Sequence, residues 1–339
     1  DLTIIDVPGH ERFVKTMVAG VSSIDFAILV IAADDGIMPQ TREHLDILQI
    51  LGVESGVIVL NKIDIVDEEW LDLVEEDVRI FALGTFLENA PIMRVSAETG
   101  LGIEKLRKFL LEALPRQIDI DKSAPFRMPV DRAFKVKGFG LVATGTVLSG
   151  QLEPGSILDI LPSGLTGRVR NLQIHGESVK KVSVGDRAAI NITTIEGQDI
   201  KRGDVLATSR MFDSTQMLDV RLHLLDSSPS NLKQRARVRL HVGTAEVLGR
   251  VQLLECDVLK PGEITFAQLR LETPICVTWG DNFVVRRYSP ALTIGGGMIL
   301  DPQPKKRRNI NNTEKEFFQN MESASLTDVV LTMVKFLEG

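Results

Sequence analysis

Cysteine is scarce in this chain, and several other class-defining features are missing. Only Cys256 and Cys276 occur among 339 residues, which excludes a disulfide scaffold and a zinc site built from cysteines alone. Both lie in apolar surroundings, so we expect two small, buried hydrophobic side chains. No apolar run reaches the length of a membrane span, and no signal-peptide pattern is present. We therefore expect a cytoplasmic protein with no membrane partner.

An excess of positive charge is also missing. The formal net charge is −7, which argues against a surface adapted throughout to nucleic acid but leaves room for a local basic patch. Hydrophobic residues make up 44% and charged residues 25%, as in soluble globular proteins. Because 339 residues exceed one ordinary core, we expect two to four domains.

The first part of the chain, residues 1–117, alternates short runs rich in Ile and Val with helical patterns. The runs are apolar throughout, which is typical of parallel strands buried on both faces, and we expect an α/β sheet. They are Leu2 to Ile5, Ala27 to Ala33, Val57 to Leu60 and Ile92 to Val95. Since no Met precedes the first run, we expect that an upstream segment is missing.

The rest of the chain has a different texture. Short alternating strands separated by glycine turns predict two all-β barrels or sandwiches, over residues 124–210 and 216–304, with a linker between them. Residues 305–339 form a third stretch, with the basic run Lys305 to Arg308 and an amphipathic helix from Ser325 to Leu337. We interpret the basic run as a solvated cluster of linker charges, with contact to RNA phosphate as the alternative.

Two short motifs at expected strand ends carry chemistry. In the first, Asp6-Val7-Pro8-Gly9-His10, the carboxylate of Asp6 can hold the hydration shell of Mg²⁺. Gly9 lets a backbone N–H approach a phosphate closely, and His10 can orient or polarise the attacking water. A strand–turn–helix corner with a surface histidine is the plain structural interpretation, which the added Pro8 and His10 disfavour.

The second motif is Asn61-Lys62-Ile63-Asp64, which directly follows the run that ends at Leu60. Guanine presents two neighbouring N–H donors that the carboxylate of Asp64 can accept together. Asn61 can contact the base, and the alkyl stem of Lys62 can cover a face of the ring. After the next strand, Ser96-Ala97 places a backbone N–H where it can meet the guanine carbonyl oxygen. Together the motifs predict a guanine-nucleotide site.

These motifs, in this order, resemble translational GTPases of the elongation factor Tu type, as do the segments Ala33 to Leu45, Val136 to Leu158 and Ile200 to Leu206. The third domain, with Val238 to Glu255 and Leu271 to Pro302, is similar to that of the bacterial selenocysteine-specific elongation factors, and this resemblance covers essentially the whole chain. It implies an incomplete P-loop-type GTPase domain, two β-barrel domains and the start of a helical winged-helix extension.

The same resemblance implies the function. It predicts a factor that binds GTP or GDP with Mg²⁺, hydrolyses GTP, and delivers selenocysteinyl-tRNA to the ribosome at recoded UGA codons. In that family a winged-helix extension binds a hairpin in the selenoprotein mRNA. The P-loop and first switch of the family have no counterpart here, so we expect the chain alone to bind GTP weakly or not at all.

A pocket for selenocysteine is predicted to be cationic, because a selenol is an anion at neutral pH. The second domain, residues 124–210 and called the second barrel below, offers Arg168 and Arg170, which are two residues apart and share a strand face. His175 lies beyond the end of that strand, and Arg202 lies further along the chain. Solvated barrel charges are the plain interpretation of each.

Two alternatives stay open. One is an elongation factor Tu-like or initiation-factor gamma-type carrier of another aminoacyl-tRNA, which the amino-acid sequence of the third domain disfavours. The other is a binding module that does not hydrolyse GTP, which the presence of both His10 and the Asn61 motif disfavours.

Overall fold

The computed structural model describes residues 4–7, 17–18, 24–113, 123–136, 140–194 and 199–323. The chain divides into two compact units, of which one holds the first domain and the other holds both all-β domains. Among the described residues, none of the helices is long and apolar enough to cross a membrane.

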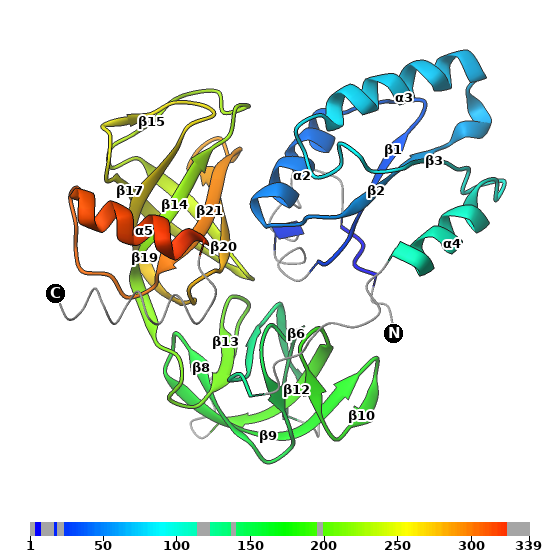
Figure 1. The fold of residues 1–339 in the computed structure, drawn as a ribbon. Helices are drawn as coiled ribbons and strands as arrows, with labels where there is room; N and C mark the ends of the chain where they lie inside the picture. The colour runs from blue at the N-terminus through cyan, green and yellow to red at the C-terminus, as the bar shows by residue number, and fades with distance from the viewer. Residues whose placement is uncertain are drawn as a thin grey trace. The chain divides into compact units, whose positions relative to one another are not determined.

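The first unit contains a parallel three-stranded sheet in the order β1-β2-β3, formed by β1 (Ala27–Ala32), β2 (Gly56–Asn61) and β3 (Ile92–Arg94) (Figure 1). Its helices are α2 (Pro39–Ile50), α3 (Glu68–Ala82) and α4 (Ile103–Ala113). Apolar residues of α2 and α3 share one core with one face of the sheet, and α4 packs against the other face. Coverage of both faces explains why β2 and β3 are apolar throughout. In β1 only one face is covered by the described residues, since Ile28 and Val30 are 40% and 56% exposed.

The predicted strands at Ala27, Val57 and Ile92 are confirmed, but the run from Leu2 to Ile5 is not a strand in its described part. Ile4 and Ile5 lie outside any strand, and Ile4 is 77% exposed. Among the described residues the sheet ends at β1, so these two residues have no ladder in which their backbone groups could pair.

The second domain is an eight-stranded antiparallel sheet in the order β4-β13-β8-β9-β12-β6-β5, with β10 paired to β9, and its inward-facing side chains form one apolar cluster. Its strands are β4 (Arg127–Pro129), β5 (Arg132–Val136), β6 (Gly140–Thr146), β8 (Ile157–Leu161), β9 (Leu165–Ile174), β10 (Glu177–Val179), β12 (Arg187–Thr194) and β13 (Val205–Thr208). A separate pair joins β7 (Gln151–Leu152) to β11 (Val182–Ser183).

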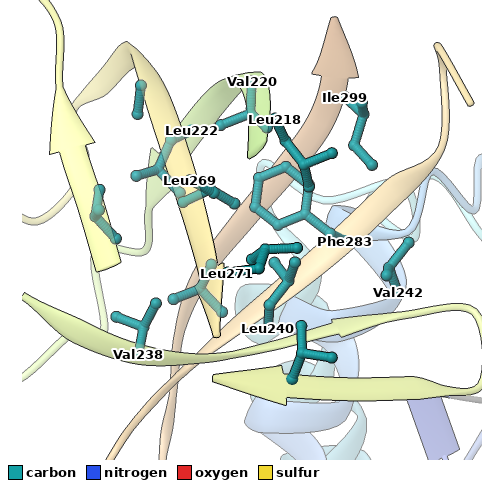
Figure 2. Packing of buried hydrophobic residues seen from close by; sticks show 14 of the residues in the cluster. Leu218, Val220, Leu222, Val238, Leu240, Val242, Leu269, Leu271, Phe283 and Ile299 are labelled. Carbon is teal, nitrogen blue, oxygen red and sulfur yellow. The ribbon is translucent and has the colours of Figure 1, made fainter. Parts of the chain in front are cut away.

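The third domain, called the third barrel below, is a closed barrel in the order β14-β19-β17-β16-β20-β21. Its strands are β14 (Ser214–Leu224), β16 (Arg237–Val242), β17 (Ala245–Leu253), β19 (Ile264–Cys276), β20 (Asn282–Arg287) and β21 (Thr293–Asp301), and β15 (Leu232–Lys233) pairs with β18 (Val258–Leu259) beside it. Leu, Val and Ile side chains surround Phe283 in its core (Figure 2). The all-β prediction for both domains is therefore confirmed.

Two sequence expectations for the third domain are wrong. In β16, Val238 and Leu240 are buried as predicted, but His241 is buried too, at 2% exposure. Cys276 is buried, whereas Cys256 is only half-buried. The two barrels are joined by an ion pair in which the guanidinium of Arg127 donates two hydrogen bonds of 2.6 Å to Asp281.

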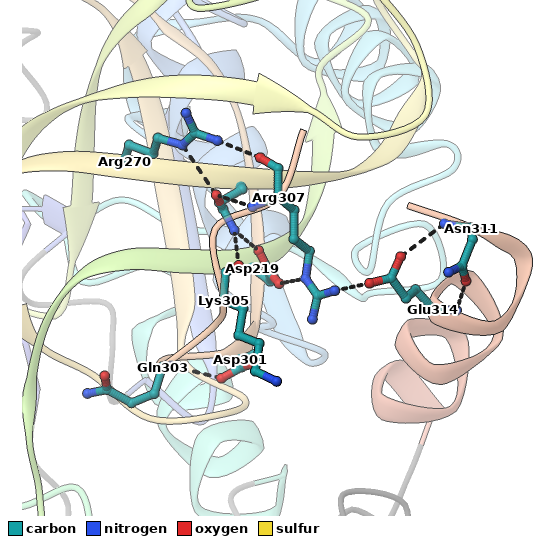
Figure 3. A network of polar contacts seen from close by, with 9 residues as sticks. Asp219, Arg270, Asp301, Gln303, Lys305, Arg307, Asn311 and Glu314 are labelled. Carbon is teal, nitrogen blue, oxygen red and sulfur yellow. Dashed lines mark hydrogen bonds and ion pairs between the residues drawn. The ribbon is translucent and has the colours of Figure 1, made fainter. Parts of the chain in front are cut away.

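In the basic run Lys305, Lys306 and Arg308 are exposed, as interpreted, but the interpretation is wrong for Arg307, whose side chain is largely buried. The segment 303–308, called the strap below, crosses the outside of the third barrel (Figure 3). Arg307 donates from Nε to Asp219 at 2.9 Å and also pairs with Glu314, and its side chain is only 12% exposed. The side chain of Asp219 is fully buried and accepts a second bond, of 2.8 Å, from Gln268.

A helix that the sequence pattern did not predict follows the strap. Helix α5 (Asn312–Ser323) opens with a reciprocal pair of bonds in which the N–H of Glu314 donates to the Asn311 side chain at 2.9 Å and the N–H of Asn311 donates to the Glu314 carboxylate at 3.0 Å. Phe317, Phe318 and Met321 then pack against the barrel in a cluster of their own. The helix expected from Ser325 to Leu337 lies outside the described residues.

Candidate functional site

The carboxyl ends of β1, β2 and β3 meet at one edge of the parallel sheet, and the motif residues lie there. The register pairs Ala32 with Asn61 and Leu60 with Arg94, so the segments that follow each strand are neighbours. In open α/β sheets this edge is where ligands bind. The sheet therefore brings together the second motif, Ser96-Ala97 and the turn after β1.

Asn61 and Ala97 are in direct contact. The backbone N–H of Ala97 donates to the side-chain oxygen of Asn61 at 3.0 Å, and the carbonyl oxygen of Asn61 accepts from Ala33 N–H at 2.8 Å. The N–H that we expected to meet a guanine carbonyl oxygen is thus engaged by Asn61 in this structure. Asn61 acts as a brace between the turns that follow β1 and β3.

Ser96 stabilises the turn that follows β3. Its side chain is fully buried and accepts a hydrogen bond of 3.0 Å from Thr99 N–H. Gly102 closes the turn with a φ of +76°, and a Cβ there would meet the carbonyl oxygen of Arg94. Only glycine combines this left-handed backbone with so close an approach.

Lys62 is held in an uncommon backbone conformation, with a φ of +63°. Its ammonium group donates to both carboxylate oxygens of Asp34, at 3.0 and 2.8 Å, and lies 3.8 Å from Asp35. This contact raises the pKa of Lys62 and lowers the pKa of Asp34, in each case mainly through the hydrogen bond between them. The Lys62 side chain therefore bridges the turns after β1 and β2.

Asp64 is exposed in the short 3-10 helix η2 (Ile63–Ile65), two residues beyond Lys62. An exposed carboxylate at the end of a parallel sheet is available to two parallel N–H donors. The structure thus places Asn61, Lys62, Asp64, Ser96 and Ala97 at one edge, as the sequence predicts.

Two braces that the sequence analysis missed hold α3 beside this edge. Trp70 donates from its indole N–H to the carbonyl oxygen of Ala33 at 2.9 Å. Arg94, at the end of β3, pairs with Glu68, Asp72 and Glu75 along α3 at 3.1, 2.5 and 2.8 Å. The acidic first half of α3, together with an arginine at the end of the next strand in the chain, was a signal that could have indicated the second brace.

The first motif is described only in part. Asp6 is exposed and lies outside any strand, while Gly9 and His10 lie outside the described residues. A single exposed carboxylate suits Mg²⁺, which keeps several of its waters and takes few protein ligands.

The four residues expected to form the cationic selenocysteine pocket are not all brought together. Arg168 and Arg170 are exposed on β9, with Val169 buried between them, and a β-bulge against β12 falls at Arg170. His175 comes five residues after Arg170, which at the usual rise of a strand corresponds to about 16 Å. With φ of +52° and +85°, His175 and Gly176 form the tight turn between β9 and β10.

Arg202 lies elsewhere in the same domain. It is exposed in the turn between β12 and β13, and the next residue, Gly203, lies close to Ala245 of the third barrel. Only Arg168 and Arg170 thus form the shared cationic face that the sequence predicts.

Family models match all three domains. Residues 1–116 match the elongation factor Tu GTP binding domain, residues 140–207 match elongation factor Tu domain 2, and residues 219–306 match the beta-barrel domain of selenocysteine-specific elongation factor.

Similar proteins agree with these matches. A selenocysteine-specific elongation factor of Desulfomicrobium baculatum is 43% identical over 98% of this chain and 52% of its own length. Elongation factor Tu 2 of Streptomyces avermitilis is 31% identical over 87% of this chain and 78% of its own length. A crystal structure of bacterial selenocysteine-specific elongation factor EF-Sec superposes with a TM-score of 0.81 at 31% identity, over 96% of this chain and 53% of that one. The chain thus spans about half the length of the Desulfomicrobium baculatum relative and of the EF-Sec structure.

Proposed function

Because the chain belongs to the translational GTPases of the elongation factor Tu type, we propose that it is the part of a selenocysteine-specific elongation factor that binds guanine nucleotide and tRNA. The observation that carries this proposal is the third barrel, since residues 219–306 match a domain model specific to selenocysteine-specific factors. The whole protein hydrolyses GTP and delivers selenocysteinyl-tRNA to the ribosome at recoded UGA codons.

Guanine is read at the edge of the three-stranded sheet. Asp64 accepts from the ring N–H and the 2-amino group, and the stem of Lys62 lies over a face of the ring. Asn61 holds Ala97 in place, and a base that binds there shares or displaces the bond between them. The side chains are held mainly by contacts between turns, so the geometry exists before the base arrives.

The first motif serves the phosphate end. Asp6 holds water in the shell of Mg²⁺, Gly9 gives a backbone N–H access to the terminal phosphate, and His10 orients the attacking water. Bound Mg²⁺ supplies charge neutralisation of the phosphates. Mg²⁺ and GTP or GDP are accordingly the proposed cofactors.

The aminoacyl end of the tRNA meets the second barrel. Arg168 and Arg170 offer two guanidinium groups on one strand face, which favour a selenolate over a neutral hydroxyl. His175 and Arg202 stay as outer candidates for the rim of this pocket. The proposed partners are selenocysteinyl-tRNA, the ribosome and, through a further domain of the whole protein, a hairpin in the selenoprotein mRNA. Its proposed location is the cytoplasm.

The test of base recognition uses the protein expressed from its complete gene and the substitution Asp64→Asn. We expect wild type to prefer GDP over xanthosine diphosphate, and Asp64→Asn to reverse this preference, because an amide can donate to the 2-oxo group of xanthine. Fluorescent-nucleotide titration measures both affinities. A wild-type protein that binds neither nucleotide would contradict the proposal.

The test of the pocket compares selenocysteinyl-tRNA with seryl-tRNA on the same tRNA. Arg170→Ala is expected to weaken binding of the selenocysteinyl form more than the seryl form, and Lys180→Ala, an exposed cation of the same domain, serves as the matched control. Unchanged discrimination would remove Arg170 from the pocket.

A second candidate function follows from the Streptomyces avermitilis relative, which this chain covers to 78% of its length. It is the carriage of other aminoacyl-tRNAs in the manner of elongation factor Tu. Equal binding of selenocysteinyl-tRNA and a standard aminoacyl-tRNA would favour this candidate.

A further inference from the structure

The turn after β1 carries two adjacent carboxylates, Asp34 and Asp35, whose role the motifs do not explain. The backbone of this turn is closed by hydrogen bonds from Asp35 N–H and Gly36 N–H to the carbonyl oxygen of Ala32, at 3.2 and 2.9 Å. The carboxylate of Asp34 therefore has a defined position at the edge of the sheet where the guanine motif lies.

Asp34 and Asp35 differ in their contact with Lys62. Asp34 accepts two hydrogen bonds from the ammonium group, while Asp35 stays 3.8 Å away and is 61% exposed. The far end of the Lys62 side chain is thus held by one carboxylate, and the side chain starts from a left-handed backbone. A lysine whose ammonium group is held in this way has lost part of the rotamer freedom that a free lysine keeps.

The surrounding contacts hold the two turns together. Ala33 donates its N–H to the carbonyl oxygen of Asn61 and accepts from the indole of Trp70, so the residue before Asp34 is fixed to β2 and to α3. These bonds keep the backbone at Asp34 close to Lys62, within reach of the ammonium group. The arrangement restricts where the Lys62 stem can lie.

We propose that Asp34 is a positioning residue for guanine recognition, which holds the stem of Lys62 where it covers the base. This inference rests on the proposed function, because it requires that a guanine base bind at this edge. Part of the conformational entropy of Lys62 is lost before binding, so less is lost when the base arrives. Asp34 acts on the ring face, and Asp64 acts on the ring edge.

The experiment measures the Kd of fluorescent GDP and inosine diphosphate for the protein expressed from its complete gene, with variants Asp34→Asn, Asp35→Asn and Lys62→Met. Asp34→Asn is expected to raise both Kd values by about two- to fivefold, since an exposed ion pair contributes modestly. The ratio of the two Kd values is expected to equal that of the wild-type protein. The two ligands differ only in the 2-amino group of guanosine, which Asp64 reads and Asp34 does not. Asp35→Asn, the matched control, changes either Kd by less than Asp34→Asn does.

A double substitution separates positioning from general support of the fold. In the Lys62→Met background, Asp34→Asn is expected to have no further effect, because the ammonium group that Asp34 holds is gone. An equal effect of Asp34→Asn with and without Lys62 would overturn the inference, as would a wild-type Kd in the single variant. Failure of the wild-type protein to bind GDP would instead overturn the proposed function.

Discussion

Replacing Arg307 by methionine tests whether the strap is part of the third domain. The substitution keeps most of the side-chain volume but removes both ion pairs, and it leaves the fully buried carboxylate of Asp219 with Gln268 as its remaining side-chain partner. Breaking a buried ion pair by removing one partner costs about 3–5 kcal/mol. We expect a loss of this size in the free energy of unfolding at pH 7.5.

The size of the loss depends on pH through Asp219. Burial raises the pKa of Asp219 from 3.8 to about 6, although the bonds from Gln268 and Arg307 act in the opposite direction. The folded chain therefore holds this proton more tightly than the unfolded chain does. The stabilisation from the proton is complete below about pH 4 and is lost as the pH rises through 6. At pH 5 Asp219 is mostly protonated, so Arg307→Met is expected to cost only the hydrogen bonds, about 1 kcal/mol.

Urea unfolding at pH 5 and at pH 7.5 measures the difference between wild type and variant, so that other titrating groups cancel. The matched control is Arg308→Met, which removes an exposed cation from the same strap. Adding Asp219→Asn to Arg307→Met is expected to recover most of the loss at pH 7.5, because no buried charge is then left. A loss that is absent at pH 7.5, or is equal at both pH values, would refute the reasoning.

Three further predictions follow from the backbone and from the contact between the barrels. Gly102→Ala is expected to destabilise the first domain by more than ~1 kcal/mol in thermal unfolding, because φ is positive and a Cβ meets the Arg94 carbonyl. Gly100→Ala, with a similar φ but open space, is its control and should cost less. His175→Asn should leave the melting temperature unchanged and His175→Val should lower it, since asparagine tolerates the left-handed turn and valine does not; equal effects would contradict the turn assignment. Arg127→Met, which breaks a buried ion pair between the barrels, should cost about 3–5 kcal/mol in urea unfolding, and a wild-type midpoint would count against that pair.

Much of the fold could be predicted because the sequence pattern is strong where an element buries at least one whole face. The strands β1 and β2 are continuous Ile, Leu and Val runs, and α3 carries its apolar residues at helical spacing. Helix α5 was missed because it is polar over most of its length and its apolar residues are few. Its capping pair, Asn311 and Glu314, stands at the spacing of a helix start and could have indicated it.

The contacts that position the site could not be predicted, because they join residues far apart in the chain. Lys62 belongs to a recognisable motif, but its partner Asp34 lies 28 residues earlier in the sequence. Arg307 was interpreted as solvated because it stands in a run of four cations, and its partner Asp219 lies 88 residues earlier. Local composition indicates charge, whereas burial depends on which strands lie side by side.

The measurement that tests the central claim most directly is the affinity of the protein from its complete gene, with a non-hydrolysable GTP analogue, for selenocysteinyl-tRNA and seryl-tRNA on the same tRNA. The account predicts that the selenocysteinyl form binds at least about tenfold more tightly, a difference of about 1.4 kcal/mol. Equal affinities of the two forms would contradict it.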